Sequence, residues 1–224
     1  MVDSGERVAS SRVAHFESFH KWASTVAGVA ALAISLYNFT ELQQNPQIDV
    51  TLPHTLRLGQ EGKASVIYVQ PTVSTRLKTQ SVEVVRDTRL DVIPAGSTSS
   101  SARPVFYWSA SGTWAYDFNA DSIDWRWIGD PAPFIVSQDK PQQPTLRFQA
   151  NDWSFRPGRY KGVLKLSRSG GRNALFQTFC LMMPKEAVKE IREGPKRTIY
   201  FFRNDVPRSS SSSASSGCYE WQKG

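Results

Sequence analysis

Histidine, methionine and cysteine are scarce in this chain, and their scarcity excludes several kinds of site. The 224 residues include three His, three Met and two Cys. A zinc site of four cysteines is therefore impossible, and a site of two Cys and two His would have to use His15 or His20, near the N-terminus. Because His54 stands alone, a Ser-His-Asp arrangement has no natural set of members in the rest of the chain.

Long apolar runs are also rare, and only one is present. Residues 22–40 (WASTVAGVAALAISLYNFT) carry no charge, and Lys21 and Glu41 flank them. As a helix these residues span roughly 28 Å, close to the hydrocarbon thickness of a bilayer. Aromatic rings suited to the two water interfaces stand at both ends, namely Trp22, Tyr37 and Phe39. The run predicts a single transmembrane helix over residues 22–40.

The cations around this run predict its orientation. Arg7, Arg12 and Lys21 precede it, whereas the next 20 residues carry only Arg57. The positive-inside rule places residues 1–21 in the cytoplasm as a short irregular tail, and the rest of the chain outside the plasma membrane. A cleaved signal peptide is an alternative, since Ala31-Leu32-Ala33 imitates a cleavage site. That site lies inside the apolar run, which favours an uncleaved signal anchor.

One face of the predicted span carries small side chains at every fourth position: Ala23, Ala27, Ala31 and Ser35. Such a face lets a second helix backbone approach closely, so it is a candidate for homodimerisation. An alanine-rich helix also produces this spacing by chance.

The rest of the chain shows short alternating or β-branched runs separated by turn residues, a pattern typical of strands. We predict strands at 48–52, 64–73, 82–93, 106–108, 113–118, 145–150, 159–167, 174–183 and 197–202, with a hairpin turn at Ser109–Gly112. Residues 184–193, which begin with Pro184 and stop before Gly194, predict one short helix. The class is all-β.

Residues 156–166 (RPGRYKGVLKL) resemble a late strand of immunoglobulin-like sandwiches, in which a Tyr folds back at a corner. Tyr160 is that residue here, although the Cys and Trp spacing of true immunoglobulin domains is absent. The resemblance implies an immunoglobulin-like antiparallel β-sandwich with one short helix over residues 41–206, followed by a Ser-rich flexible tail at 207–224.

Charge is divided between two parts of this domain. The net charge of the chain is +7, yet residues 105–139 carry five acids against Arg126. On the basic side, Lys161 and Lys165 lie on one predicted strand, and their neighbours Arg159, Arg168, Arg172 and Lys196 extend the patch. This patch suits teichoic acid, lipid phosphate or a protein, whereas a solvated outer face is the plainer interpretation. We do not expect a nucleic-acid ligand.

Aromatic residues concentrate in the acidic part. Exposed rings are what sugars or a partner protein stack on, and the candidates are Trp114, Tyr116, Trp125 and Trp127. Strand alternation points the members of each pair the same way, so core packing is the alternative. We single out Trp125 and Trp127, because turn residues flank them.

Oxygen side chains at Asp117, Asn119 and Asp121 have the spacing of a calcium loop. Ser122 and Ile128 occupy the positions where such loops need Gly and Glu. Turn capping is therefore the alternative, and no other cofactor is expected.

These patterns favour a non-catalytic, single-pass membrane protein that binds a protein or an anionic or glycan polymer of the cell envelope. Two alternatives remain. One is a membrane-tethered carbohydrate-active enzyme that uses Asp121 or Asp124 with Asp130. The other is a soluble basic binding protein in which residues 22–40 are a core helix. Cys180 and Cys218 either pair or leave Cys180 as a small buried side chain.

Overall fold

The computed structural model describes residues 6–43, 47–76, 82–96, 104–119, 121–137, 140–194, 198–206 and 217–223. The chain divides into two compact units, one of residues 1–45 with 78–81 and one of residues 46–77 with 82–224. Lys196 and most of the serine tract lie outside the described residues.

The first unit contains the helix α1 (Glu6–Leu42). Its segment Trp22–Leu42 is long and apolar enough to cross a membrane. Within this unit residues 22–40 are exposed along their whole length, including the small residues Ala23, Ala27, Ala31 and Ser35. The helix begins at Glu6, which corrects the prediction of an irregular tail over residues 1–21.

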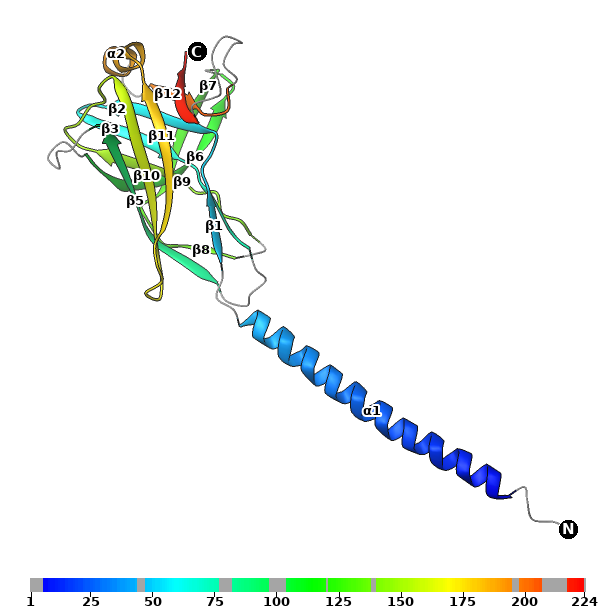
Figure 1. Ribbon diagram of the computed structural model, residues 1–224. Helices are drawn as coiled ribbons and strands as arrows, with labels where there is room; N and C mark the ends of the chain where they lie inside the picture. Colours follow the sequence, from blue (N-terminus) through cyan, green and yellow to red (C-terminus); the bar gives the residue numbers. More distant parts are fainter. Residues whose placement is uncertain are drawn as a thin grey trace, which may run out of the picture. The chain divides into compact units, whose positions relative to one another are not determined.

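The described residues of the second unit form thirteen strands and one helix, most of which are labelled in Figure 1. The elements are β1 (Ile48–Thr51), β2 (Thr55–Glu61), β3 (Ala64–Val69), β4 (Thr72–Thr75), β5 (Glu83–Pro94), β6 (Val105–Asp117), β7 (Ser122–Gly129), β8 (Phe134–Val136), β9 (Thr145–Ala150), β10 (Gly158–Arg168), β11 (Leu175–Met183), α2 (Lys185–Glu193), β12 (Ile199–Arg203) and β13 (Cys218–Gln222). The structure is mostly β, which confirms the all-β class.

Nine of these strands close into a barrel, which overturns the predicted immunoglobulin-like sandwich. The order is β6-β9-β3-β2-β12-β13-β11-β10-β5, and β5 pairs back to β6 through Leu90 and Phe106. β7 and β8 extend the sheet beyond the barrel, and β1 pairs with β4 in a small separate sheet. Inward and outward side chains alternate in a barrel as in a sandwich, so alternation did not distinguish the two folds.

The inward side chains fill the barrel with aliphatic and aromatic groups, including Leu58, Ile67, Phe106, Phe148 and Leu164. The predicted tyrosine corner is confirmed locally: the Tyr160 hydroxyl donates to the Arg156 carbonyl at 2.8 Å and accepts the Arg156 amide at 2.9 Å. The predicted helix is also confirmed as α2, with Pro184 at its N-cap. A corner tyrosine therefore does not require a sandwich.

The predicted hairpin at residues 106–118 is wrong, because β6 runs unbroken from Val105 to Asp117. Ser109–Gly112 does not turn the chain. It contains irregularities in the pairing of β6 with β9 and β7, where the strand changes partners. The small residues that suggested a turn instead let a long strand bend.

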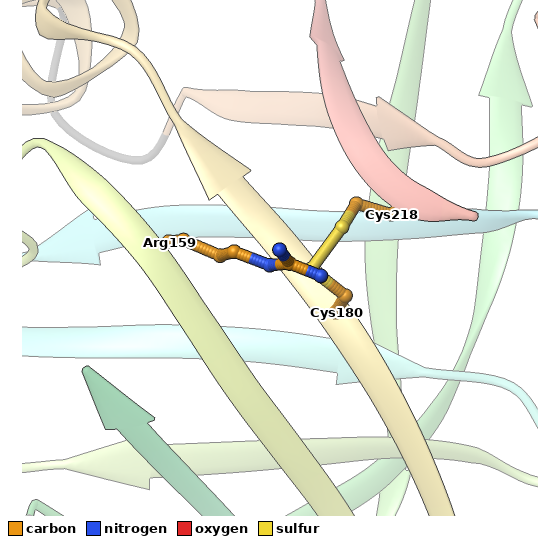
Figure 2. Close-up of a disulfide and its surroundings, with 3 residues drawn as sticks. All are labelled: Arg159, Cys180 and Cys218. Carbon is orange, nitrogen blue, oxygen red and sulfur yellow. A yellow bond between two sulfur atoms is a disulfide. The ribbon is translucent and has the colours of Figure 1, made fainter. Parts of the chain in front are cut away.

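The predicted boundary at residue 206 is also wrong, because β13 lies beyond the serine tract and belongs to the barrel. β13 pairs antiparallel with β12 and parallel with β11, and a disulfide joins Cys218 to Cys180 of β11 (Figure 2). The two cysteines therefore pair. Arg159 of β10 lies beside this bond, with its Nε 3.1 Å from Cys180 Sγ.

Candidate functional site

The β6–β7 hairpin extends from the barrel and carries most of the aromatic residues singled out in the sequence. β6 pairs with β9 as far as Gly112, and the residues after Gly112 pair with β7. In that register Trp114 lies opposite Trp125, and Gly112 opposite Trp127. The structure thus brings all four predicted aromatic residues onto one hairpin.

Two of these rings pack against the outside of the barrel wall. The ring centroid of Tyr68 on β3 lies 4.9 Å from that of Trp114 and 4.8 Å from that of Trp125. The guanidinium of Arg57 on β2 stacks 4.5 Å above the Trp114 ring. Trp114 and Trp125 are half-buried. They hold the hairpin in place, which is a packing role on the outer face of the barrel.

Gly112 makes this packing possible. A Cβ at this position would collide with the six-membered ring of Trp125 and with the Arg126 carbonyl. The missing side chain therefore leaves the space in which the Trp125 indole lies across the hairpin.

Residues of the hairpin and of the barrel wall together line a groove of about 1020 Å³. Trp127 and Tyr116 remain 62% and 45% exposed and line it. The other lining residues are Glu61, Tyr68, Ala110, Asp121, Ser122, Ile123, Asp124, Trp125, Arg147, Thr198, Ile199 and Phe201. The groove therefore combines open rings, an apolar wall on β12 and two carboxylates on the hairpin.

Glu61, Tyr68 and Arg147 of the groove wall are paired with one another. Arg147 Nη2 lies 2.7 Å from Glu61 Oε2, and the Tyr68 hydroxyl donates to Glu61 Oε1 at 3.2 Å. Burial, with the charge of Glu61 beside it, raises the pKa of Tyr68 to about 12. Burial also lowers the pKa of Arg57. These partners fix the side chains of the wall in one arrangement.

The calcium interpretation is not supported. Asp117 Oδ1 accepts the backbone amide of Asn119 at 2.8 Å, and Asp121 accepts a hydrogen bond from the Tyr116 hydroxyl. Asp121 itself has a φ of 47°, as a turn residue often does. Across the part of the chain that the structure describes, no three His, Cys, Asp or Glu side chains gather as a metal site would require. Asp117 and Asn119 form a turn instead.

The basic strand is only partly available. Arg168 and Arg172 form ion pairs with Glu83, a carboxylate that is 0% exposed. These two cations therefore neutralise a buried acid and do not extend an anion-binding surface. Lys161 is exposed, and the Lys165 ammonium lies 5.8 Å above the Phe176 ring. Neither lysine lines the groove.

Of the carboxylates considered for a glycosidase, Asp121 and Asp124 line the groove and Asp130 does not. The sequence did not predict the part of the groove that the barrel contributes, which includes Glu61, Tyr68, Arg147 and Phe201, nor Arg57 behind Trp114. Their positions depend on strand register, because Phe201, Arg57, Tyr68 and Arg147 are successive partners across four strands. A polar residue at an outward position of an apolar strand, such as Arg147, was the one local signal.

No protein family and no curated protein sequence matches this chain. Among solved structures, it is similar to a family 123 glycoside hydrolase from Clostridium perfringens, studied for the hydrolysis of glycolipid glycans. The identity is 11% and the TM-score 0.32, over 62% of this chain. The match spans 27% of that enzyme. A likeness at this level has no bearing on activity here.

Proposed function

We propose that this chain is a membrane-anchored, non-catalytic binding protein that takes its partner in the groove beneath the β6–β7 hairpin. The observation that carries the proposal is the open indole of Trp127 at the mouth of a groove whose other walls are held rigidly. Exposed Trp and Tyr side chains next to fixed charges are typical of binding hot spots. The internal pairing of Glu61 with Arg147 and of Asp121 with Tyr116 suits recognition better than proton transfer.

The proposed location is the outer face of the plasma membrane, with residues 1–21 in the cytoplasm. Three features support it: the apolar segment Trp22–Leu42, the cations that precede it, and the disulfide between Cys180 and Cys218. Disulfides persist in oxidising compartments and are rare in the cytosol. The envelope outside the membrane offers both proteins and polymers as partners.

Site-specific photo-crosslinking in the cells that produce the protein tests the groove without knowledge of the ligand. Trp127→p-benzoylphenylalanine should give a covalent adduct with the partner. Phe176→p-benzoylphenylalanine is the matched control, because Phe176 is also exposed but lies beside Lys165 on the basic strand. Adducts from position 176 and none from position 127 would move the site to the basic strand and contradict the proposal.

A further inference from the structure

β7 presents an unpaired edge along the groove. It pairs with β6 on one side, and no described strand pairs with its other side. The other end of the same sheet is β8, which has three residues, whereas β7 has eight. Eight residues of strand offer an edge roughly 26 Å long. Proteins usually shorten, charge or cover such edges, so a long unpaired edge is a candidate site for the binding of another strand.

The groove follows this edge. Ser122, Ile123, Asp124 and Trp125 are consecutive in β7, and all four line the groove. Successive side chains of a strand point to opposite faces, so a groove that meets four in a row extends past one face of the hairpin and reaches the edge of β7. A ligand in the groove can therefore reach the backbone amides and carbonyls of the free β7 edge.

The aromatic residues fit a peptide better than a sugar. A glycan platform needs open ring faces, yet the Trp125 ring packs against both Tyr68 and Trp114, with centroids 4.8 Å and 5.4 Å away. The Tyr116 hydroxyl is engaged by Asp121. Trp127, Ile128 and Ile123 stay exposed along the strand and suit the side chains of an added strand.

The charges around the groove indicate which side chains a strand bound there should carry. The hairpin from Asp117 to Asp130 carries four aspartates against Arg126, and Asp121 and Asp124 line the groove. The facing wall on β12 offers Ile199 and Phe201, both half-buried and uncharged. A strand that alternates basic and apolar residues matches both sides.

We infer that the groove binds an extended, basic peptide segment of a partner protein, which adds to the β7 edge as a further strand. This inference rests on the proposed function and names the class of partner. Main-chain hydrogen bonds to β7 supply affinity, and the aspartates and the β12 wall select the side chains.

The test uses the full chain in dodecyl maltoside micelles and a fluorescein-labelled decapeptide of alternating Lys and Val. Fluorescence anisotropy should show saturable binding. A second peptide carries methyl groups on four consecutive central amide nitrogens, which removes donors from both edges and keeps every side chain. It should bind at least tenfold more weakly, because several backbone hydrogen bonds are each worth about 0.5–1.5 kcal/mol.

Two protein variants check the charge selection. Asp124→Asn should weaken binding of the unmethylated peptide about two- to fivefold, as expected for a solvent-exposed ion pair. Asp130→Asn is the matched control, since Asp130 is an exposed aspartate at the other end of the hairpin strand and does not line the groove. It should change binding less than twofold.

Three results would overturn the inference. The first is equal binding of the methylated and unmethylated peptides, or no binding of either. The second is displacement of the bound peptide by chitohexaose, which would make a sugar the occupant. The third is sedimentation showing a dimer of the chain that Trp127→Ala abolishes, which would make a second copy the occupant. If position 127 still crosslinks in cells, any of these leaves the proposed function intact.

Discussion

Gly112 is essential to the packing of the hairpin, because any side chain at this position would collide with the Trp125 ring. Gly112→Ala should displace that indole from Tyr68 and Trp114. Overpacking of this kind costs about 1–3 kcal/mol of stability. Urea denaturation would measure it. Gly129→Ala is the matched control on the same hairpin, with open space around its Cβ position, and should be nearly neutral. Equal stability of the two variants would contradict the packing described for Trp125.

Two buried tyrosines should make the free energy of unfolding depend on pH in the alkaline range. Burial raises the pKa of both Tyr68 and Tyr219 to about 12, against about 10 in an unfolded chain. The folded state holds these protons more tightly than the unfolded state. Their contribution to stability is therefore intact below about pH 10 and is lost as the pH rises towards 12. Ultraviolet titration should show a late phase of tyrosine ionisation that accompanies unfolding, and Tyr68→Phe combined with Tyr219→Phe should reduce its amplitude, with burial of Tyr160 and Tyr200, which also raises their pKa, accounting for the remainder. A late phase of unchanged amplitude in the double variant would contradict this assignment.

Among the elements, β13 depends most on a covalent bond. The disulfide joins residues 38 apart in the sequence, and chain-entropy arguments give about 3–4 kcal/mol for a loop of that length. Cys180→Ala combined with Cys218→Ala should lower the free energy of unfolding by about this amount in chemical denaturation. The same measurement on the unsubstituted protein with dithiothreitol should reproduce the loss. If neither treatment changes stability, β13 is held by its hydrogen bonds and by the buried Tyr219 ring alone.

The elements that the sequence predicted well are those with a dense apolar pattern. Residues 145–150 were predicted as a strand and form β9, and residues 184–193 were predicted as a helix and form α2 from Lys185. β2 was missed because only Leu56 and Leu58 point inward among polar neighbours. β7 was missed because it lies outside the barrel and needs no buried alternation. A local hydrophobic pattern reflects burial, so strands with few buried side chains cannot be recognised from their sequence pattern.

At the scale of the whole molecule, closure of the barrel could not be predicted from the sequence. It depends on Leu90 meeting Phe106 between β5 and β6, and on β13 returning beside β11 after the serine tract. Neither contact leaves a periodic signal. The groove shares this limit, since six of its fourteen lining residues come from segments that precede or follow the hairpin in the sequence. The aromatic candidates on the hairpin came from composition, and the residues on the barrel wall required the strand register.

The membrane segment makes a separate prediction for the whole protein. The full chain should remain in the membrane fraction after carbonate or high-salt washing and leave it only with detergent, because Trp22–Leu42 is long and apolar enough to span the bilayer. Protease added to spheroplasts should digest the barrel and spare an N-terminal tag. Release by carbonate alone would contradict anchoring, and digestion of the tag with a protected barrel would reverse the orientation.

The bond between Cys218 and Cys180 also governs how the barrel responds to mechanical force. A strand pulled from its end peels away one hydrogen-bonded pair at a time, so each step resists only weakly. Tension on β13 from beyond Gln222 cannot peel it past Cys218, because the disulfide passes the load to Cys180 of β11. β11 is paired along nine positions with β10, and Cys180 lies within that run. A force applied at this end of the barrel therefore acts on two strands joined by a disulfide. We expect β11 and β13 to separate from the barrel together rather than β13 unzipping alone.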